Sequence, residues 1–369
     1  MLIVIKKKIV DMENDIKLMK GNEAIAYGAM RCGCDAYFGY PITPQSEIME
    51  TLMEQQPWET TGMVVLQAES ETAAINMLYG AAGTGKRCMT SSSSPGISLM
   101  SEGISYIAGA ELPCLIVNIS RGGPGLGTIQ PSQADYFQAT KAAGHGDFHL
   151  IVLAPASVQE MHDFVPLAFD LAFKYRNPVM LLADGVVGQM MEKVQLLPQR
   201  PRWTNDEVLQ TQGDWAITGK KNRERNIITS LDLDPVGQDK FNRKLIEKYN
   251  TIRQNEVRYE EYLCDDAEYL MVGYGISARI AQKAVENLRK EGVKVGLLRP
   301  ITLFPFPTQA IEKRALQLKG ILSVEMSAGQ MIEDIRLAVG KAIPVHHYGR
   351  MGGMIHNPTE VEEAFRGCF

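Results

Sequence analysis

The same succession of segments occurs at five places in the sequence. A short apolar run is followed by polar or glycine-rich residues and then by an apparent helix. Alternating strands and helices predict an α/β fold with a parallel sheet and right-handed crossovers. Ligands bind such sheets at the carboxyl ends of the strands. One edge of one domain is therefore expected to collect a glutamate, a threonine, an arginine and many backbone amides. The stretches concerned are Tyr40–Pro44, Glu69–Glu71, Ser91–Ser94, Arg121–Gly127 and Ala154–Ser157.

Length and charge narrow the classes of protein. A chain of 369 residues predicts two or three domains. A net charge of −5 gives no electrostatic footprint for nucleic acid or an anionic membrane. The longest apolar runs, such as Leu150–Ala156, are far shorter than a membrane span. The opening residues have the wrong order for a secretory signal, so we expect a cytoplasmic protein that binds neither nucleic acid nor membrane.

The pattern divides the chain into four parts. Residues 1–20 are interpreted as an N-terminal extension, and 21–190 as the first α/β unit. Residues 191–264 lose the alternation and are predicted to be a linking segment, with a charged helix over 240–261. A second α/β unit is predicted over 265–369. Within the two units we expect helices at 43–55, 71–82, 96–110, 158–175, 276–292 and 307–318.

The sequence contains two features that suggest a phosphate-binding loop and a metal site, but neither meets the requirements of such a site. Gly80–Lys86 fits the spacing of a phosphate-binding loop, but Arg87 follows where Ser or Thr is needed, and the segment leads from a helix into a strand. The six cysteines form no CxxC pair and no four-cysteine cluster run, so we interpret them as buried reduced thiols. No metal is expected on this chain.

Glu71 is on the apolar side of its predicted helix. Counting 3.6 residues per turn places it on the face of Ala74, Ile75 and Leu78. It could simply complement the helix N-terminus, which is worth about 0.3–1 kcal/mol. Alternatively it is a buried carboxylate, which needs a partner such as a ligand nitrogen.

Thr43 and Arg121 are the other candidates. Thr43 follows a strand and is adjacent to Pro44, so it could bind a ligand or act as a helix N-cap. Arg121 ends an apolar run and precedes glycines, so its guanidinium could bind a carboxylate or phosphate bidentately. An ordinary structural salt bridge is the alternative.

Four segments resemble the alpha subunit of 2-oxoacid:ferredoxin oxidoreductases, most closely the branched-chain (3-methyl-2-oxobutanoate) enzyme. They are residues 39–48 (GYPITPQSEI), 67–85 (QAESETAAINMLYGAAGTG), 91–113 (SSSSPGISLMSEGISYIAGAELP) and 121–139 (RGGPGLGTIQPSQADYFQA). The resemblance covers residues 21–369. It implies a thiamine-diphosphate-type pyrimidine-binding domain over 21–190 and a transketolase C-terminal-like α/β domain over 265–369.

The resemblance also implies roles for individual residues. It places the family's pyrimidine-binding glutamate on Glu71, not Glu69, with Tyr40 and Pro41 also at the cofactor. It places substrate-carboxylate contacts on Thr43 and Arg121. The implied reaction converts a 2-oxoacid and CoA into acyl-CoA and CO₂ and reduces ferredoxin, with the cofactor as electron sink.

The resemblance implies that other subunits provide part of the active site and the iron–sulfur clusters. The sequence holds neither the GDG…N motif for Mg²⁺ and diphosphate nor a cluster motif. Thiamine diphosphate is therefore expected to be shared with a partner subunit, with Mg²⁺ and [4Fe–4S] on beta and gamma/delta-type partners. Two alternatives stay open: a 2-oxoglutarate enzyme of the same family, which needs a second cation for the distal carboxylate, and a non-catalytic scaffold subunit.

Overall fold

A computed structural model describes residues 15–141, 143–221 and 223–369. Most of the predicted N-terminal extension, residues 1–14, lies outside this part. Residues Ile16–Lys20 form strand β1, which pairs antiparallel with β8 (Met191–Gln195). Met19 of β1 is buried. The last residues of the predicted extension are therefore part of the first domain.

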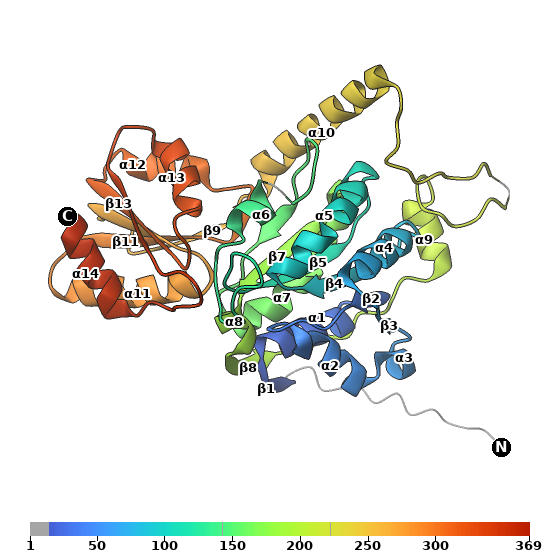
Figure 1. The fold of residues 1–369 in the computed structure, drawn as a ribbon, viewed down its shortest axis with the longest axis horizontal. Helices are drawn as coiled ribbons and strands as arrows, with labels where there is room; N and C mark the ends of the chain where they lie inside the picture. Colours follow the sequence, from blue (N-terminus) through green and yellow to red (C-terminus); the bar gives the residue numbers. More distant parts are fainter. Residues whose placement is uncertain (1–14, 142, 222) are drawn as a thin grey trace.

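The first domain is a seven-stranded sheet with the order β12-β6-β7-β5-β4-β2-β3 (Figure 1). Neighbouring strands are parallel, except that β12 pairs antiparallel with β6. The strands are β2 (Ala36–Gly39), β3 (Val64–Gln67), β4 (Cys88–Ser92), β5 (Leu115–Ser120), β6 (Ile151–Leu153), β7 (Val179–Asp184) and β12 (Thr302–Phe304).

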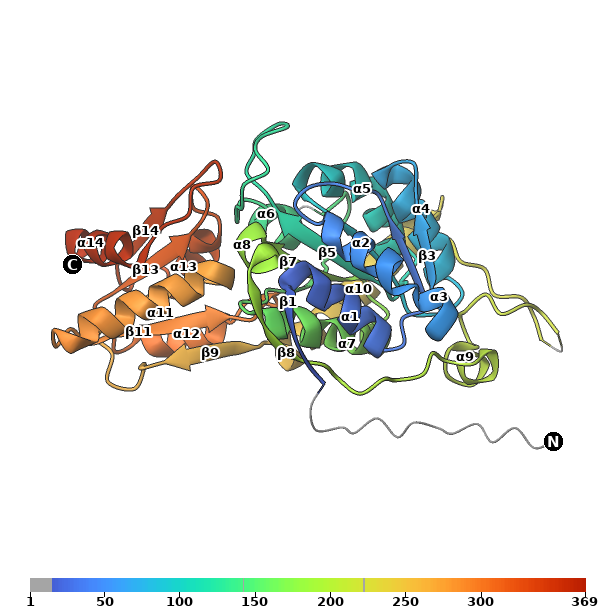
Figure 2. The same cartoon turned by 90° about the horizontal axis from the view of Figure 1, so that it is seen from below.

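Helices cover both faces of this sheet. Helices α1 and α7 pack against each other on one face, and α4 and α5 on the other (Figures 1 and 2). Strands β4, β5 and β7 are buried along their whole length, as expected for the centre of a parallel sheet. The helices are α1 (Gly21–Arg31), α2 (Ser46–Gln55), α3 (Pro57–Thr60), α4 (Glu71–Ala82), α5 (Ser94–Gly109), α6 (Tyr136–Thr140), α7 (Val158–Tyr175) and α8 (Gly185–Gln189).

The second domain contains a five-stranded sheet with the order β14-β13-β10-β11-β9. Its strands are parallel except for β9, which pairs antiparallel with β11. The strands are β9 (Tyr259–Tyr262), β10 (Tyr269–Val272), β11 (Val295–Pro300), β13 (Gly320–Glu325) and β14 (Val345–Gly349). The helices are α11 (Gly275–Lys290), α12 (Thr308–Ala315), α13 (Met331–Val339) and α14 (Pro358–Cys368).

The intervening segment contains α9 (Asn205–Gln212) and α10 (Pro235–Asn255). The prediction of a helix through residue 261 is wrong at its end, because residues 259–262 form β9 and hydrogen-bond to β11. The boundaries at 190 and 264 stay a prediction, and strand pairing crosses both, through β8 with β1 and β9 with β11. The α/β class and its two largely parallel sheets are confirmed.

Buried polar contacts fix the two domains to each other. Gln133 donates through Nε2 to the backbone oxygen of Tyr274 (2.8 Å), and its Oε1 accepts from Ser277 Oγ (2.7 Å). Asp184 accepts from the backbone N–H of Ile276 (3.0 Å) while capping α8 of its own domain. Burial raises the pKa of the Asp184 carboxyl, and these backbone N–H donors partly offset the effect. The domains therefore meet through directional bonds as well as apolar packing.

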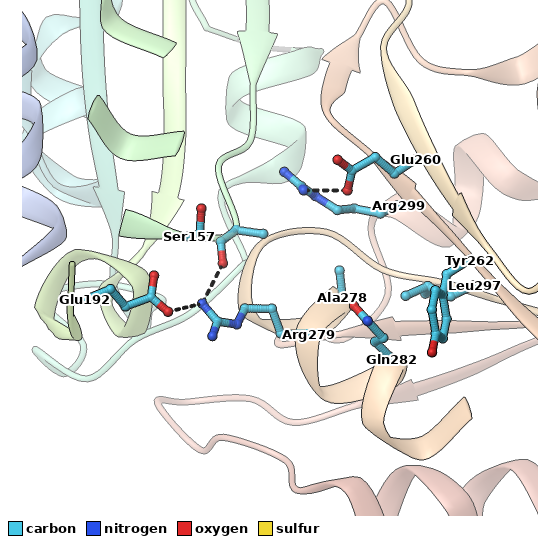
Figure 3. A pocket seen from close by; sticks show the side chains of 10 residues that line it. Ser157, Glu192, Glu260, Tyr262, Ala278, Arg279, Gln282, Leu297 and Arg299 are labelled. Atoms are coloured by element: carbon cyan, nitrogen blue, oxygen red, sulfur yellow. Dashed lines mark hydrogen bonds and ion pairs between the residues drawn. The ribbon is translucent and has the colours of Figure 1, made fainter. Parts of the chain in front are cut away.

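Ion pairs line a second region of the domain boundary, a cavity of about 270 Å³ (Figure 3). Arg279 of α11 pairs with Glu192 (2.8 Å) and donates to the backbone oxygen of Ala156 (3.2 Å). Arg299 of β11 is buried and pairs with Glu160 of α7 and with Glu260 (2.8 Å). Arg299 thus connects the second domain to the start of a helix in the first.

We predict that Arg299→Met weakens domain docking. The substitution keeps an apolar stem but removes charged hydrogen bonds worth about 1.5–3 kcal/mol, and it leaves Glu160 without its ion-pair partner. Urea unfolding should show a loss of stability in this range. Arg366→Gln, in the exposed pair with Glu291, is the control and should cost less than about 1 kcal/mol. Equal losses for both variants would contradict the role given to Arg299.

Candidate active site

The candidate site lies where three adjacent strands end. Strands β2, β4 and β5 are neighbours in the sheet and run parallel. Their carboxyl ends lead into Tyr40, Ser93 and Arg121 respectively. The other two stretches follow β3 and β6, which run parallel to these strands in the same sheet. The predicted gathering of the five stretches at one edge of the sheet is therefore confirmed.

Arg121 is a buried cation held by neutral groups. Its Nη1 donates to the backbone oxygen of Thr43 (3.0 Å), and its Nη2 donates to the backbone oxygen of Leu126 (3.1 Å). Its Nε is buried without a hydrogen-bond partner in the described part of the chain. Among the described residues no carboxylate forms an ion pair with it, so the structural salt-bridge alternative has no partner there. An anion at this point would complete the coordination of the guanidinium.

Thr43 contacts Arg121 through its backbone oxygen and not through its side chain. It is exposed and occupies a turn before α2, which begins at Ser46 with Gln45 as its N-cap. The predicted helix start at 43 and the N-cap alternative are therefore wrong. A residue that precedes a proline is disfavoured in helical conformation, which explains the later start. Among the described residues the hydroxyl of Thr43 has no hydrogen-bond partner, and the residue is exposed.

A buried hydrogen-bond chain fixes the turn that carries Tyr40 and Pro41. The hydroxyl groups of Tyr37 and Ser91 are 2.7 Å apart, and Ser91 Oγ donates to Gln45 Oε1 (2.6 Å). Gln45 Nε2 in turn donates to the backbone oxygen of Tyr40 (3.1 Å). Tyr40 is half-buried and Pro41 exposed. Both remain predicted cofactor contacts at the end of β2.

Glu71 is buried at the first position of α4, with 6% of its surface exposed. Ser70 caps the helix by accepting from the backbone N–H of Ala73 (3.1 Å). None of the hydrogen bonds or ion pairs among the described residues involves the Glu71 carboxylate. The helical phase predicted from the sequence is confirmed, because Glu71 shares the buried face with Ala74, Ile75 and Leu78.

The first turn of α5 approaches Glu71 closely. A Cβ at Gly96 would lie 2.9 Å from Glu71 Oε1 and 2.0 Å from Ser92 Oγ, so only glycine fits there. The hydroxyl groups of Ser92 and Ser93 are fully buried, without partners among the described residues. A carboxylate beside orphaned hydroxyl groups suits a polar heterocycle such as the aminopyrimidine of thiamine diphosphate. Glu71, which keeps 6% of its surface exposed, is the side chain that would hold that ring.

Asp135 is a site residue that the sequence analysis missed. Its Oδ2 accepts from Ser94 Oγ (2.6 Å) and Asn118 Nδ2 (2.8 Å), and Ser94 Oγ also accepts from the backbone N–H of Arg121 (2.9 Å). Burial raises the pKa of the Asp135 carboxyl, and the bonds from Ser94 and Asn118 partly offset the effect. Asp135 thereby fixes the backbone that carries the guanidinium. Its place in the 121–139 segment was the only sequence signal.

A cavity of about 680 Å³ opens beside Arg121 and is shared by both domains. Arg121 is the only cationic side chain among the described residues that line it. Its apolar lining side chains are Pro95, Pro124, Ala134, Met326, Ala328 and Met351. Glu71 does not line this cavity, but it contacts Gly96, next to Pro95. The structure thus brings Thr43 and Arg121 together. It places Glu71 outside the cavity, beside Gly96 in the first turn of α5.

The remaining stretches identified from the sequence do not line the cavity beside Arg121. Ala154–Ser157 follows β6, and Ala156 and Ser157 line the interdomain cavity with Arg279 (Figure 3). Gly80–Lys86 connects α4 to β4, so its rejection as a phosphate-binding loop is confirmed. Among the described residues no group of three or more His, Cys, Asp or Glu side chains is placed to hold a metal ion, and no helix is long and apolar enough to cross a membrane.

Comparison with known proteins identifies relatives of both domains. The family model of the thiamine-diphosphate-binding domain of pyruvate flavodoxin/ferredoxin oxidoreductase matches residues 27–261. The model of pyruvate:ferredoxin oxidoreductase core domain II matches residues 267–361. These matches confirm the predicted kinds of domain.

Curated relatives match over nearly the full chain. Ketoisovalerate oxidoreductase subunit VorB of Methanothermobacter thermautotrophicus is 52% identical over 95% of this chain and 97% of its own. The 2-oxoglutarate synthase subunit KorA of Methanocaldococcus jannaschii is 37% identical over 95% of this chain and 100% of its own.

Solved structures agree on the fold. The 2-oxoglutarate:ferredoxin oxidoreductase of Magnetococcus marinus, solved with 2-oxoglutarate, coenzyme A and succinyl-CoA, matches with a TM-score of 0.84 and 26% identity. The match covers 96% of this chain and spans 65% of that one. A split-gene transketolase matches with a TM-score of 0.58 and 12% identity over 94% of this chain and 96% of its own, which shows the fold alone.

We predict that Glu71→Gln lowers turnover with thiamine diphosphate by about 10²- to 10⁴-fold, because the amide cannot accept or hold a proton as the carboxylate does. Folding should survive, since a neutral amide costs less to bury than an unpaired charge. Hydrogen–deuterium exchange at the cofactor C2 measures the effect directly. Glu69→Gln is the control, because Glu69 is exposed, and should be mild. Normal exchange in the Glu71 variant together with slow exchange in the Glu69 variant would reverse the assignment.

Proposed function

The chain belongs to the 2-oxoacid:ferredoxin oxidoreductase family as an alpha-type subunit, and we propose that it acts on a branched-chain 2-oxoacid, 3-methyl-2-oxobutanoate. In this reaction the acid and CoA give acyl-CoA and CO₂, and ferredoxin accepts the electrons. The observation that carries the proposal is the cavity beside Arg121, whose described lining has a single cation. The rest of the lining is the carboxylate of Asp135, uncharged hydroxyl and amide side chains, glycines and six apolar side chains. Such a cavity suits one carboxylate followed by an uncharged side chain.

Two residues fix the carboxylate in this proposal. Arg121 offers its guanidinium, and its Nε has no protein partner in the described part of the chain. Thr43 orients the guanidinium through its backbone oxygen and leaves its hydroxyl group available for a second contact. Asp135, through Ser94, keeps the backbone of Arg121 from shifting.

Glu71 acts on the cofactor side. Thiamine diphosphate, when bound, supplies the electron sink for decarboxylation of a 2-oxoacid. Glu71 would hydrogen-bond the pyrimidine ring and hold a proton there, with Ser92 and the close approach at Gly96 excluding water from the carboxylate. Tyr40 and Pro41, at the end of β2, would border the same ring.

A 2-oxoglutarate enzyme is the alternative from the same family, and more distant relatives carry that name. A distal carboxylate in the Arg121 cavity would find no second cation among the described lining residues, and the lining already contains the carboxylate of Asp135. Burying a charge without a partner costs several kcal/mol, which disfavours this substrate. A non-catalytic scaffold is disfavoured by the burial of the Arg121 guanidinium without an ion-pair partner among the described residues, an arrangement that an inert subunit has no reason to keep.

We propose further that the active complex contains beta and gamma/delta-type subunits. These partners would bind Mg²⁺, the diphosphate end of the cofactor and [4Fe–4S]. This chain would contribute the pyrimidine side of the shared cofactor and the carboxylate site. The relatives at 52% and 37% identity are themselves named as subunits, which supports an assembly of several chains.

A substrate panel tests the proposal. The reconstituted complex would be offered 3-methyl-2-oxobutanoate, pyruvate and 2-oxoglutarate with CoA and a viologen dye. We expect kcat/KM for 3-methyl-2-oxobutanoate to exceed that for 2-oxoglutarate by at least about 100-fold, because of the unpaired distal charge. A preference for 2-oxoglutarate would overturn the branched-chain assignment, and inactivity with all three acids would favour the scaffold.

We predict that Arg121→Ala lowers kcat/KM for every 2-oxoacid by about 10- to 150-fold, the equivalent of about 1.5–3 kcal/mol for a charged hydrogen bond. Cofactor affinity should stay nearly unchanged, because Arg121 is on the substrate side. Arg121→Lys, which keeps the charge but loses the planar fork, should be intermediate. Unfolding curves of the three proteins provide the control. An unchanged kcat/KM, or loss of folding in place of activity, would return Arg121 to a structural role.

A further inference from the structure

Two loops from different domains meet at the mouth of the Arg121 cavity. One follows β5 and spans residues 121–131; the other follows β14 and spans residues 350–357, and both are visible in Figure 2. Gly353 in the second loop has φ +94°, and a Cβ there would lie 2.4 Å from Gln130 Cβ and 3.1 Å from Thr128 Cγ2. The C-terminal loop can therefore rest on the Arg121 loop only because glycine occupies this position.

This contact brings Met351 into the lining of the cavity. Met351 is 59% exposed, so its side chain lies at the mouth and can change rotamer without disturbing the core. Met326, also from the C-terminal domain, is 1% exposed and lies deeper. Its backbone is fixed on both sides, since its N–H donates to Gln133 Oε1 (3.0 Å) and its oxygen accepts from the Gln133 N–H (2.9 Å).

The two domains contribute different kinds of lining. The apolar side chains from the N-terminal domain are Pro95, Pro124 and Ala134, which are rigid or short. The C-terminal domain contributes Ala328 and the two methionines, and the methionines are long, flexible and polarizable and adapt to irregular apolar ligands. A substrate whose carboxylate is on Arg121 would thus meet its adjustable contacts on the C-terminal domain.

We infer that Met351, with Met326 beneath it, is the specificity-determining residue for the acyl side chain of the 2-oxoacid. The inference rests on the proposed function, because it requires the substrate carboxylate to bind Arg121. In this arrangement Arg121 recognises the part common to all 2-oxoacids. Met351 limits the length of the side chain and, being uncharged, leaves a distal carboxylate unpaired.

Shortening the side chain provides the first test. In the reconstituted complex, Met351→Ala should raise kcat/KM for 4-methyl-2-oxopentanoate relative to 3-methyl-2-oxobutanoate by about 10-fold, the scale expected for one methylene in an apolar pocket. Met354→Ala is the matched control: it is 55% exposed on the same loop but does not line the cavity. Its ratio should stay within about twofold of wild type, well below the one-methylene effect.

Adding a charge provides the second test. Met351→Lys should raise kcat/KM for 2-oxoglutarate relative to 3-methyl-2-oxobutanoate by about 10-fold or more, because the ammonium group can pair with the distal carboxylate. Met354→Lys should leave this ratio unchanged. Wild-type ratios in both Met351 variants, or equal shifts in the Met354 controls, would overturn the inference while leaving the proposed function intact. A wild-type complex that converts no branched-chain 2-oxoacid would instead overturn the proposed function and this inference with it.

Discussion

Parallel pairing of β2, β4 and β5 is the constraint on which the candidate site depends. Gly39 of β2 is in register with Ser91 of β4, and Ser92 of β4 with Asn118 of β5. The three strands therefore end at nearly the same level. Neighbouring strands are about 4.8 Å apart, so β2 and β5 are separated by about 10 Å across β4. Only a long side chain spans that gap, and Arg121 does so by bonding to the turn after β2.

The groups around Arg121 keep its charge in place without neutralising it. Backbone oxygens of Thr43 and Leu126 satisfy two of its nitrogens, but a carbonyl dipole offsets a buried charge only partly. Asp135 is near enough to influence the guanidinium, yet its Oδ2 is already bonded to Ser94 and Asn118. Burial raises the pKa of the Asp135 carboxyl, because desolvation disfavours its charged form. A ligand carboxylate would offset the same cost of desolvation for the buried Arg121 guanidinium.

Local periodicity predicted much of the first domain. Strand pairings between distant segments, however, could not be predicted from local patterns. Helices α4 and α7 have the bounds predicted from their apolar spacing, and the buried face of α4 was identified by counting from Glu71. The placement of β12 beside β6, and of β9 beside β11, depends on contacts that local pattern does not encode. The fold class was thus predictable, but the exact membership of each sheet was not.

The same limit applies to the site. Glu71 and Arg121 were found because a charge interrupted an apolar pattern, and such interruptions are visible in sequence. Thr43 contacts Arg121 through a backbone oxygen, and every residue type has one, so its side chain could not reveal the contact. Met351 was missed because a methionine in a glycine-rich loop has no distinctive signature before the fold places it in a cavity.

In the proposed function, the two domains recognise different parts of the substrate: the N-terminal domain binds the carboxylate, and the C-terminal domain contacts the side chain. The proposed carboxylate site is built entirely on the N-terminal domain, where Ser94 Oγ donates to Asp135 and accepts from the backbone N–H of Arg121. The adaptable wall belongs to the other domain, and Gln133 holds the two together by bonding to Tyr274, Ser277 and Met326. Because Gln133 is two residues from Asp135, any shift in docking would move both parts of the site at once. A substitution of the exposed Met351 side chain leaves these hydrogen bonds in place, whereas a substitution at Gly353 would displace the 350–357 loop from Gln130. Under the inference that Met351 contacts the acyl side chain, side-chain preference can therefore change at this residue without disturbing the proposed recognition of the carboxylate.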